Sequence, residues 1–300
     1  MASKSARKYS ITGLYFILPF LVMLLLFRLY PLLFTFQISF MRWDLLSPRE
    51  FLGLANYQRL VADPVFLQSV WNTFLIWLMN VFFRLGVALV FAYFLSQRFF
   101  SRSKHFFMAV FYLPNLITAT SIATLFAILL DWRTGTFNFL LIELGLIEQP
   151  VYWLNSAFWA RAVTAFTIGW MWFGYAAILL MAGMSAISED LYESATIDGA
   201  NEFQKFRRIT IPLIRPTLTY VFVISLIGGL QNFDIPMVLT DGLGSPDRSI
   251  LTTVMYLYNQ SFRNLNLGYG AAISFGLFAV IMAVTAASFR TLYGNRDGIE

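Results

Sequence analysis

The chain has 300 residues, of which 58% are hydrophobic and only 12% charged, about half the charged share of an ordinary soluble domain. This composition leaves too little polar surface to cover a soluble core, so it predicts an integral membrane protein. The absence of cysteine excludes disulfides and thiolate metal sites, and the single histidine, His105, excludes an all-histidine metal site. The net charge of +5 comes from bases that flank apolar runs, which argues against a nucleic-acid partner.

Six apolar segments are long enough to cross a bilayer, which takes roughly 20 residues in a helix. In chain order they cover about 11–40, 66–96, 105–130, 158–186, 217–240 and 267–292. The first is too long for the apolar core of a signal peptide, and it has no small-residue cleavage site, so we expect a retained helix. The pattern predicts an all-α integral membrane fold with six transmembrane helices.

Basic residues are divided unevenly between the two sets of loops that six spans create. Twelve lie on one side, including all four lysines, and six lie on the other. Because loops rich in Lys and Arg stay in the cytoplasm, both termini are predicted to be cytoplasmic. Arg28, Arg84 and Arg161 lie within or at the edge of spans. For Arg28 and Arg84 we favour a structural role, by snorkelling or pairing, over contact with a substrate.

This topology divides the chain into three parts. Residues 1–65 would hold the N-terminal tail, the first span and the first outer loop, and residues 294–300 a cytoplasmic tail. Residues 66–293 would form the transmembrane core, with one long cytoplasmic loop at about 187–216. No Gly-x-x-x-x-Gly-Lys-Ser/Thr pattern is present, so we expect no P-loop for ATP on this chain.

The long loop has a helix–break–helix pattern. Ser188 is a candidate N-cap, and two acids follow it in the first turn, where the helix dipole favours them. Gly199 interrupts this helix, and Phe203, Phe206 and Ile209 then form the stripe of a second one. Such a segment suits either an interfacial helix lying on the bilayer or a knob that fits a cleft of a soluble partner.

The same loop contains a motif with several fixed positions. It reads Glu193-Ser194-Ala195, two residues, Asp198-Gly199-Ala200, then Phe206 and the ending Ile209-Thr210-Ile211-Pro212. This run resembles the EAA motif of ATP-binding-cassette (ABC) importer permeases, with Ser194 in place of the first alanine. Gly53-Leu54-Ala55-Asn56-Tyr57 and Gly268-Tyr269-Gly270-Ala271-Ala272 extend the resemblance to binding-protein-dependent sugar permeases. The chain is similar to the subgroup with the F-type permease subunit of maltose import, in a shorter six-span version.

The resemblance implies the type I ABC importer (MetI-like) permease fold, on a chain that is not an enzyme. It implies no cofactor on this chain, with ATP and Mg bound to partner ATPase subunits. The implied partners are a second permease subunit in a heterodimer, two cytoplasmic ATPase subunits, an extracytoplasmic solute-binding protein, membrane lipid and a sugar, without nucleic acid. The implied location is a bacterial or archaeal cytoplasmic (inner) membrane.

In this family the EAA loop forms a coupling helix that docks into a groove of the ATPase. The motif carries this role to Glu193, Ser194, Ala195, Asp198, Gly199, Ala200 and Phe206. Glu193 would supply charge-assisted contacts, while Ala195 and Gly199 would permit close approach. A solvated face for Glu193 and a helix C-cap for Gly199 are the alternative interpretations.

A sugar path needs hydrogen-bonding groups and aromatic faces at mid-membrane depth. Alignment on the EAA motif carries the sugar contacts of the maltose-type relative to the fourth and fifth spans. The residues we select there are Met171, Trp172, Tyr175, Ser225, Gly229 and Asn232. Ile168, Gly228 and Gly229 lack polar side chains, which argues against a maltose-type sugar. Helix packing is the alternative for each of these positions.

Other functions stay open on the sequence alone. An ion-coupled secondary transporter would favour paired carboxylates within the spans, for which we find only Asp234. A membrane-embedded enzyme would need a clustered catalytic set, and we predict neither catalytic residues nor metal ligands. An ABC permease for a non-sugar solute is a further alternative.

Overall fold

The computed structural model describes residue 13 and residues 15–96 and 103–293. These residues form two compact units, and each is considered by itself. The smaller unit holds the described residues up to Asp63 together with Leu257–Gly276, and the larger unit holds Pro64–Tyr256 and the described residues from Leu277 on. The predicted cytoplasmic tail at 294–300 lies outside the described residues, and the division of the chain at residue 65 stays a prediction.

Four helices in the described part are long and apolar enough to cross a membrane: Tyr15–Ile38, Pro64–Ser96, Ala157–Ser185 and Leu267–Thr291. The number rises to six if each of two bent helix pairs is one span: Lys104–Leu116 with Ala119–Leu129, and Glu202–Leu213 with Arg215–Gly229. The predicted all-α membrane fold is confirmed. The cytoplasmic placement of both termini stays a prediction.

The third and fifth predicted spans differ from straight helices. The third bends by 92° between α5 (Lys104–Leu116) and α6 (Ala119–Leu129). Pro114 in the last turn of α5 has no N–H to donate, and the Thr118 side chain caps α6 by accepting from the Ser121 N–H. The fifth ends early because α12 (Arg215–Gly229) stops at two consecutive glycines, and a separate helix, α13 (Asp234–Leu239), follows.

The smaller unit joins the first described helix to its connecting loop. A π-helical turn, η1 (Leu25–Leu29), leads into α2 (Tyr30–Ile38), then a two-residue strand pair, β1 (Met41–Arg42) with β2 (Glu50–Phe51), and α3 (Ala55–Ala62). The Asn56 side chain donates to the carbonyls of Ser39 and Met41, both at 2.9 Å. Arg59 lies 3.8 Å over the Tyr269 ring at the start of α15 (Leu267–Tyr293), and the Tyr269 hydroxyl donates to Asp63. Residues of both outlying motif segments, Asn56 and Tyr269, therefore hold this unit together.

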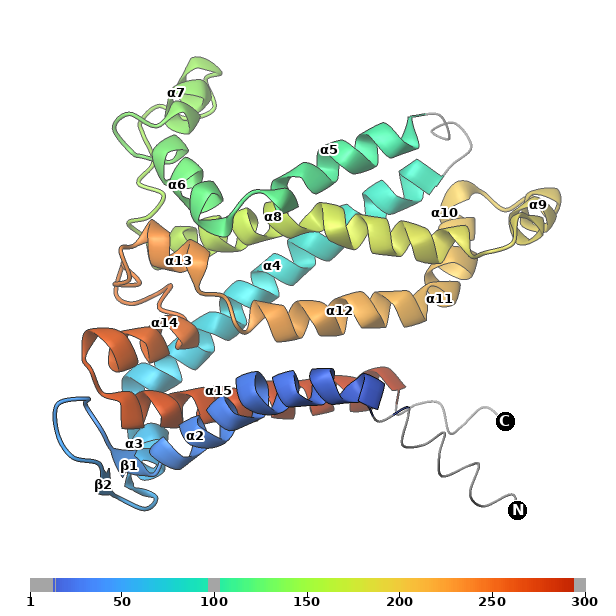
Figure 1. Cartoon of the computed structure of the whole chain (residues 1–300). Coiled ribbons are helices and arrows are strands. Elements are labelled where there is room, and N and C mark those ends of the chain that lie inside the picture. Colours follow the sequence, from blue (N-terminus) through green and yellow to red (C-terminus); the bar gives the residue numbers. More distant parts are fainter. Residues whose placement is uncertain (1–12, 14, 97–102, 294–300) are drawn as a thin grey trace, which may run out of the picture. The chain divides into compact units, whose positions relative to one another are not determined.

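The larger unit is built around α8 (Ala157–Ser185), which packs along α4 (Pro64–Ser96) and also contacts α5 and α12. In Figure 1, α5, α8 and α12 run side by side. At one end lie α9 (Glu189–Ile197), α10 (Glu202–Lys205) and α11 (Ile211–Leu213), and at the other α6, α7 (Thr136–Glu143) and α13. A π-helical turn, η3 (Phe206–Thr210), joins α10 to α11; α14 (Thr253–Tyr258) and η4 (Asn259–Arg263) precede α15.

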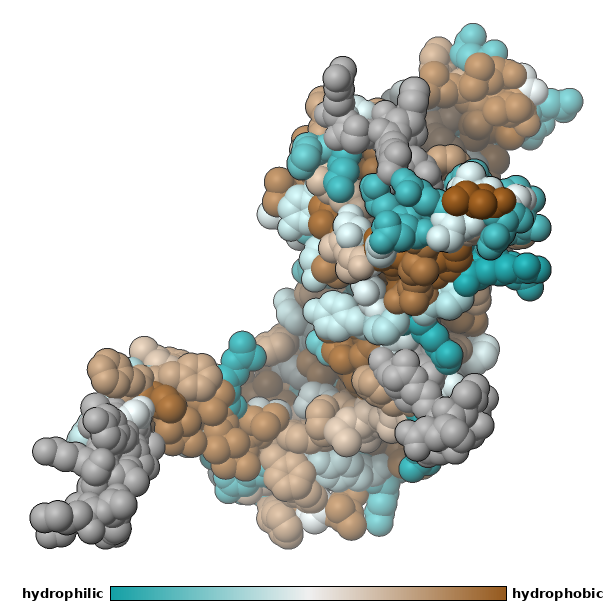
Figure 2. All heavy atoms as spheres, turned by 90° about the vertical axis from the view of Figure 1, so that its right-hand side faces the viewer, coloured by the Kyte–Doolittle hydropathy of each residue, from teal (hydrophilic) through white to brown (hydrophobic). Residues whose placement is uncertain are grey.

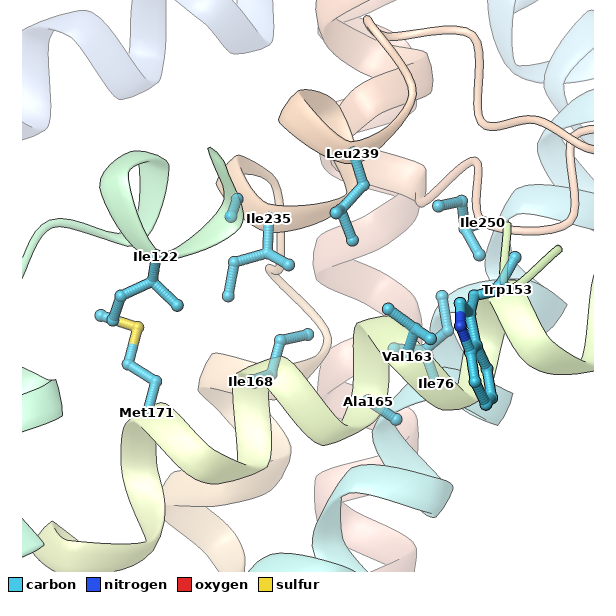
Figure 3. Close-up of a cluster of buried hydrophobic side chains, with 12 residues drawn as sticks. Ile76, Ile122, Trp153, Val163, Ala165, Ile168, Met171, Ile235, Leu239 and Ile250 are labelled. Carbon is cyan, nitrogen blue, oxygen red and sulfur yellow. The ribbon is translucent and has the colours of Figure 1, made fainter. Parts of the chain in front are cut away.

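A buried apolar cluster fixes the end of the larger unit near α6 and α13. It joins α4, α6, α8 and α13 through Ile76, Ile122, Ile168 and Ile235, among others. Figure 3 shows the side chains of Met171 on α8 and Ile122 on α6 pointing toward each other within this cluster. This packing holds the first half of α8 in place, and the cavity described next opens along the same helix.

Candidate functional site

A cavity of about 150 Å³ lies within the larger unit, between α4, α8 and α12. Five of the six residues selected for a substrate path line it: Trp172 and Tyr175 from α8, Ser225 and Gly229 from α12, and Asn232 just beyond α12. The Trp172 and Tyr175 rings meet edge to face, with centroids 6.0 Å apart. Two helices that are distant in sequence therefore bring aromatic faces and hydrogen-bonding groups to one space.

Met171 is the exception among the six. Its side chain is buried in the apolar cluster with Ile122, and Met171 is absent from the cavity lining. Successive residues on a helix point about 100° apart, so Met171 and Trp172 face different neighbours. The structure places Met171 in a packing position, whereas Trp172 is 38% exposed along the cavity.

Two further polar residues, Asn80 and Arg84 of α4, line the cavity, and the sequence analysis did not select them. The Asn80 side-chain amide donates to the Ala165 carbonyl of α8 at 3.0 Å. Arg84 lies one helical turn further along α4, so both residues share a face. Polar side chains spaced by four within an apolar span are the signal that could have identified them.

Two polar atoms of the cavity lack partners among the described residues, whereas the amides of Asn80 and Asn232 donate to the carbonyls of Ala165 and Gly229. The Nε of Arg84 and the Oγ of Ser225 are buried, and neither takes part in a hydrogen bond with any residue that the structure describes. None of the residues that line the cavity is acidic. Asp234, the carboxylate considered for ion coupling, is exposed at the start of α13 and does not line the cavity. The cavity thus offers a cation and hydroxyl and amide groups without a matching anion.

The two consecutive glycines of α12 differ in their surroundings. A Cβ at Gly229 would collide with the Trp77 ring of α4, whereas a Cβ at Gly228 would meet nothing within 4 Å. Gly229 therefore permits close packing of α12 on α4, and Gly228 leaves open space in the cavity. The packing interpretation holds for Gly229, although its backbone still lines the cavity.

In a second polar cluster of the larger unit, near the start of α8, an arginine and an asparagine are paired with each other and with backbone carbonyls. The Arg161 guanidinium donates to the Ser249 carbonyl at 3.0 Å and to the Asn72 side-chain oxygen at 2.9 Å. The Asn72 amide in turn donates to the Arg248 carbonyl at 2.6 Å. We call these groups the Asn72–Arg161 cluster. It ties α4 and α8 to the loop that precedes α14.

The predicted coupling residues lie on α9 and the turn after it. Ser188 caps α9 by accepting from the Asp190 N–H, as expected. Gly199 has φ +78°, its N–H donates to the Thr196 carbonyl, and the Ala200 N–H donates to the Ala195 carbonyl. These two bonds form a Schellman motif, whose left-handed residue is usually glycine. The C-cap interpretation of Gly199 therefore describes its conformation.

The surface of this turn is open. Glu193, Ser194, Asp198 and Gly199 are exposed, and Ile197 is 88% exposed. A Cβ at Gly199 would meet nothing within 4 Å. Figure 2 looks at the end of the larger unit where α9, α10 and α11 lie, and hydrophilic side chains gather there beside exposed hydrophobic ones. The turn presents a small-featured surface that nothing in the described chain covers.

The loop is fastened to the helices beneath it. The Tyr93 hydroxyl of α4 donates to the Glu202 carboxylate at 2.9 Å, and Lys205 pairs with the same carboxylate at 2.8 Å. Hydrogen bonds to the Glu202 carboxylate lower its pKa; the bond from Lys205 is the largest cause, and the bond from Tyr93 is the next. Glu202 lies in the predicted cytoplasmic loop, before α12. Phe206 meets Tyr93 edge to face with ring centroids 4.7 Å apart. Phe206 thus faces this unit, unlike the exposed motif residues on α9.

These features, a bundle of apolar helices with a polar cavity and an exposed, fastened loop, define the chain as a membrane transport subunit. The family described as binding-protein-dependent transport system inner membrane component matches residues 84–296, and the chain belongs to this family. It is therefore a permease subunit of an ABC importer and not an enzyme. The ion-coupled and enzymatic alternatives are set aside.

Similar proteins cover nearly the whole chain. The lactose transport system permease protein LacF of Rhizobium radiobacter is 32% identical over 98% of this chain and 97% of its own length. The sulfoquinovosyl glycerol transport system permease protein SmoG of Agrobacterium fabrum is 34% identical over 91% of this chain and 88% of its own length. The arabinooligosaccharides transport system permease protein AraP of Bacillus subtilis is 33% identical over 99% of this chain and 91% of its own length.

Solved structures agree on the fold. A chain of a bacterial ABC transporter for import of the acidic polysaccharide alginate has a TM-score of 0.80 and 21% identity, covering 99% of this chain and 100% of that one. A chain of an alginate transporter with its alginate pentasaccharide-bound periplasmic protein has a TM-score of 0.81 and 22% identity, covering 98% and 97%. The predicted MetI-like permease fold is confirmed.

Proposed function

We propose that this permease forms half of the path by which a type I ABC importer carries a sugar or oligosaccharide. The observation that carries the proposal is the cavity, where Trp172, Tyr175, Ser225 and Asn232 converge between α8 and α12. Aromatic faces and hydroxyl or amide groups suit sugar rings and their hydroxyls. The names of the three relatives described above, which transport saccharides or glycosides, support the same class of solute.

The proposed path is completed by a second permease subunit. Pockets that enclose a small ligand measure roughly 300–1,000 Å³. The cavity of this chain, at about 150 Å³, is smaller than that range. A second, different permease facing it would enlarge the space and supply the remaining contacts. This arrangement keeps the heterodimer that the sequence predicts.

The proposed coupling surface is the exposed turn on α9, from Glu193 to Ala200. ATP and Mg would bind two ATPase subunits on the cytoplasmic side, each with a groove for such a turn. Because α9 connects through its loop to α8 and α12, movement of the turn would shift the helices that line the cavity. A permease that rocks between two global states gives alternating access. Glu193 would supply charged contacts, and Ser194, Ala195 and Gly199 close approach.

The proposed topology places both termini and the α9 loop in the cytoplasm of a bacterium or archaeon, with the chain in its inner membrane. A solute-binding protein would deliver the sugar to the opposite face. The basic residues Lys205, Arg207 and Arg208 lie beside α9, which supports a cytoplasmic loop.

The experiment is uptake by proteoliposomes that contain the complete transporter. Lactose, an arabino-oligosaccharide and digalacturonate, each with the binding protein, are tested as labelled probes with ATP inside or outside the vesicles. We expect uptake of at least one saccharide that needs both ATP and the binding protein. Uptake without ATP, or no uptake of any of these saccharides, would overturn the proposal.

A further inference from the structure

Arg84 is the feature of the cavity that a neutral sugar leaves unexplained. It lies on α4 inside a span of 33 residues, and its Nε is buried without a hydrogen-bond partner in the described chain. An arginine charge at membrane depth is costly and normally pairs with an anion or with carbonyl groups. Arg161 on α8, by contrast, donates to a backbone carbonyl and to a side-chain amide oxygen.

The described chain supplies no anion to Arg84. None of the residues around the cavity is acidic, and Asp234 lies outside the lining. The remaining polar groups, on Asn80, Tyr175, Ser225 and Asn232, are neutral hydrogen-bonding groups. A guanidinium presents a planar fork of donors that matches the two oxygens of a carboxylate or sulfonate. The cavity therefore has the donors for an oxyanion next to groups suited to hydroxyls.

We propose that Arg84 binds a carboxylate or sulfonate of the transported solute, so that this permease carries an anionic saccharide. The inference rests on the proposed function and specifies its substrate class. The sugar ring would lie against Trp172 and Tyr175, and its acidic group would reach across the cavity to α4. Binding the charged group here pairs the half-buried Arg84 while the solute crosses.

The test uses matched pairs of saccharides that differ only at C6, where one member carries a carboxylate or sulfonate and the other a hydroxyl. Digalacturonate is compared with galactobiose, and methyl sulfoquinovoside with methyl glucoside, first for binding to the cognate binding protein and then for ATP-driven uptake. We expect the binding protein to carry an acidic member and the transporter to take it up. A binding protein that binds neither acidic probe overturns the proposal.

Variants then assign the preference to Arg84. Arg84→Gln should lower uptake of the acidic probe roughly 10- to 100-fold, the range for losing a hydrogen bond to a charged group. Arg84→Lys keeps the charge but loses the planar fork of donors, so its uptake of the acidic probe should lie between that of the wild type and that of Arg84→Gln. Arg28→Gln is the control, because it removes an exposed arginine on η1 in the other unit. Unchanged uptake in Arg84→Gln would overturn the proposal.

A separate measurement covers the case in which Arg84→Gln fails to assemble. The unfolding midpoint of the wild-type transporter in detergent is measured with each probe at millimolar concentration, since ligand binding to the folded state raises it. We expect a larger rise with digalacturonate than with galactobiose, and equal rises would overturn the proposal. Loss of uptake for every probe would instead count against the proposed function, whereas neutral uptake that is indifferent to Arg84→Gln would count only against this inference.

Discussion

The Asn72–Arg161 cluster joins an asparagine of α4 to an arginine of α8, whereas the cavity holds Arg84 on α4, and the two arginines differ in their partners. In the cluster, Arg161 and Asn72 bind each other and backbone carbonyls of the loop before α14. In the cavity, Arg84 and Ser225 have buried polar atoms without partners in the described chain. Polar groups are expensive inside a membrane, so the paired Arg161 indicates a structural role, and the unpaired Nε of Arg84 is open to a further partner.

This difference separates stability from transport within one helix bundle. Substitutions in the cluster should lower stability, and transport should fall only as folded protein is lost. Substitutions among the open groups of the cavity should spare stability and lower transport. Substitutions in the exposed turn at Gly199 should likewise spare stability and lower transport, because nothing in the described chain covers this turn.

Loss of Arg161 is expected to have the largest effect. Arg161→Met leaves the Asn72 oxygen and the Ser249 carbonyl without their donor, at a cost of about 1.5–3 kcal/mol for hydrogen bonds to a charged group. The thermal midpoint of the purified transporter should fall clearly. Arg84→Met, the matched control, should leave the midpoint unchanged or raise it, and a fall as large as that of Arg161→Met would break the comparison.

The glycine pair of α12 gives a sharper version of the same test. Gly229→Ala forces a methyl group into the Trp77 ring and should cost about 1–3 kcal/mol, as in other overpacked sites. Gly228→Ala adds the same methyl group to open space, so stability should hold while uptake falls. Both are read from thermal midpoints and uptake rates, and equal midpoints for the two variants would contradict the packing described.

A third substitution tests the turn after α9. Gly199→Val must adopt a left-handed conformation that costs a residue with a Cβ about 1–2 kcal/mol, whereas Gly199→Asn tolerates it. We expect Gly199→Val to lose ATP-driven uptake while the membrane helices stay folded, and Gly199→Asn to retain more activity. Binding of ATPase subunits to each variant is measured by co-purification. If Gly199→Val transports like the wild type, the turn is not a coupling surface.

The smallest effect concerns Glu202, which fastens the loop to α4. Its pKa is lowered from an ordinary value of 4.5, so its contribution to stability is present above that value and is lost as the pH falls through the lowered pKa. Transporter stability should therefore carry no Glu202 dependence from pH 6 to 8. Below about pH 4.5 the wild type should lose a small advantage over Glu202→Gln. A constant difference between the two across this range would contradict the assignment.

Most of the fold could be predicted from the sequence because length and apolarity alone define a spanning helix. The bends of the third and fifth spans could not be predicted. Pro114 and the pair Gly228–Gly229 mark possible breaks, but the packing of α6 against α13 decides how the chain continues after each break. The Schellman turn at Gly199 followed from glycine after a capped helix. That Ser188 would cap α9 followed equally from local chemistry.

The candidate site was harder to predict, since it depends on which face of each helix looks inward. Tyr175, Ser225 and Asn232 were found through the resemblance, which already contains that information. The same alignment selected Met171, whose side chain packs in the apolar cluster and does not line the cavity. Arg84 was interpreted as structural because the sequence does not show whether a partner is within reach. That its Nε has no partner among the residues the structure describes appears only in three dimensions.

The central claim, that the cavity lies on the transport path, can be tested directly because the chain has no native cysteine. Ser225→Cys places a thiol at the cavity with little change in volume, and Ala177→Cys places one in the packed face of α8 as a control. The rate of reaction with 2-sulfonatoethyl methanethiosulfonate is measured on the assembled transporter, without ATP and after trapping with ATP and vanadate. We expect the Ser225→Cys rate to change at least 10-fold between the two states, which corresponds to about 1.4 kcal/mol, while Ala177→Cys stays unreactive. Equal rates for Ser225→Cys in both states would contradict it.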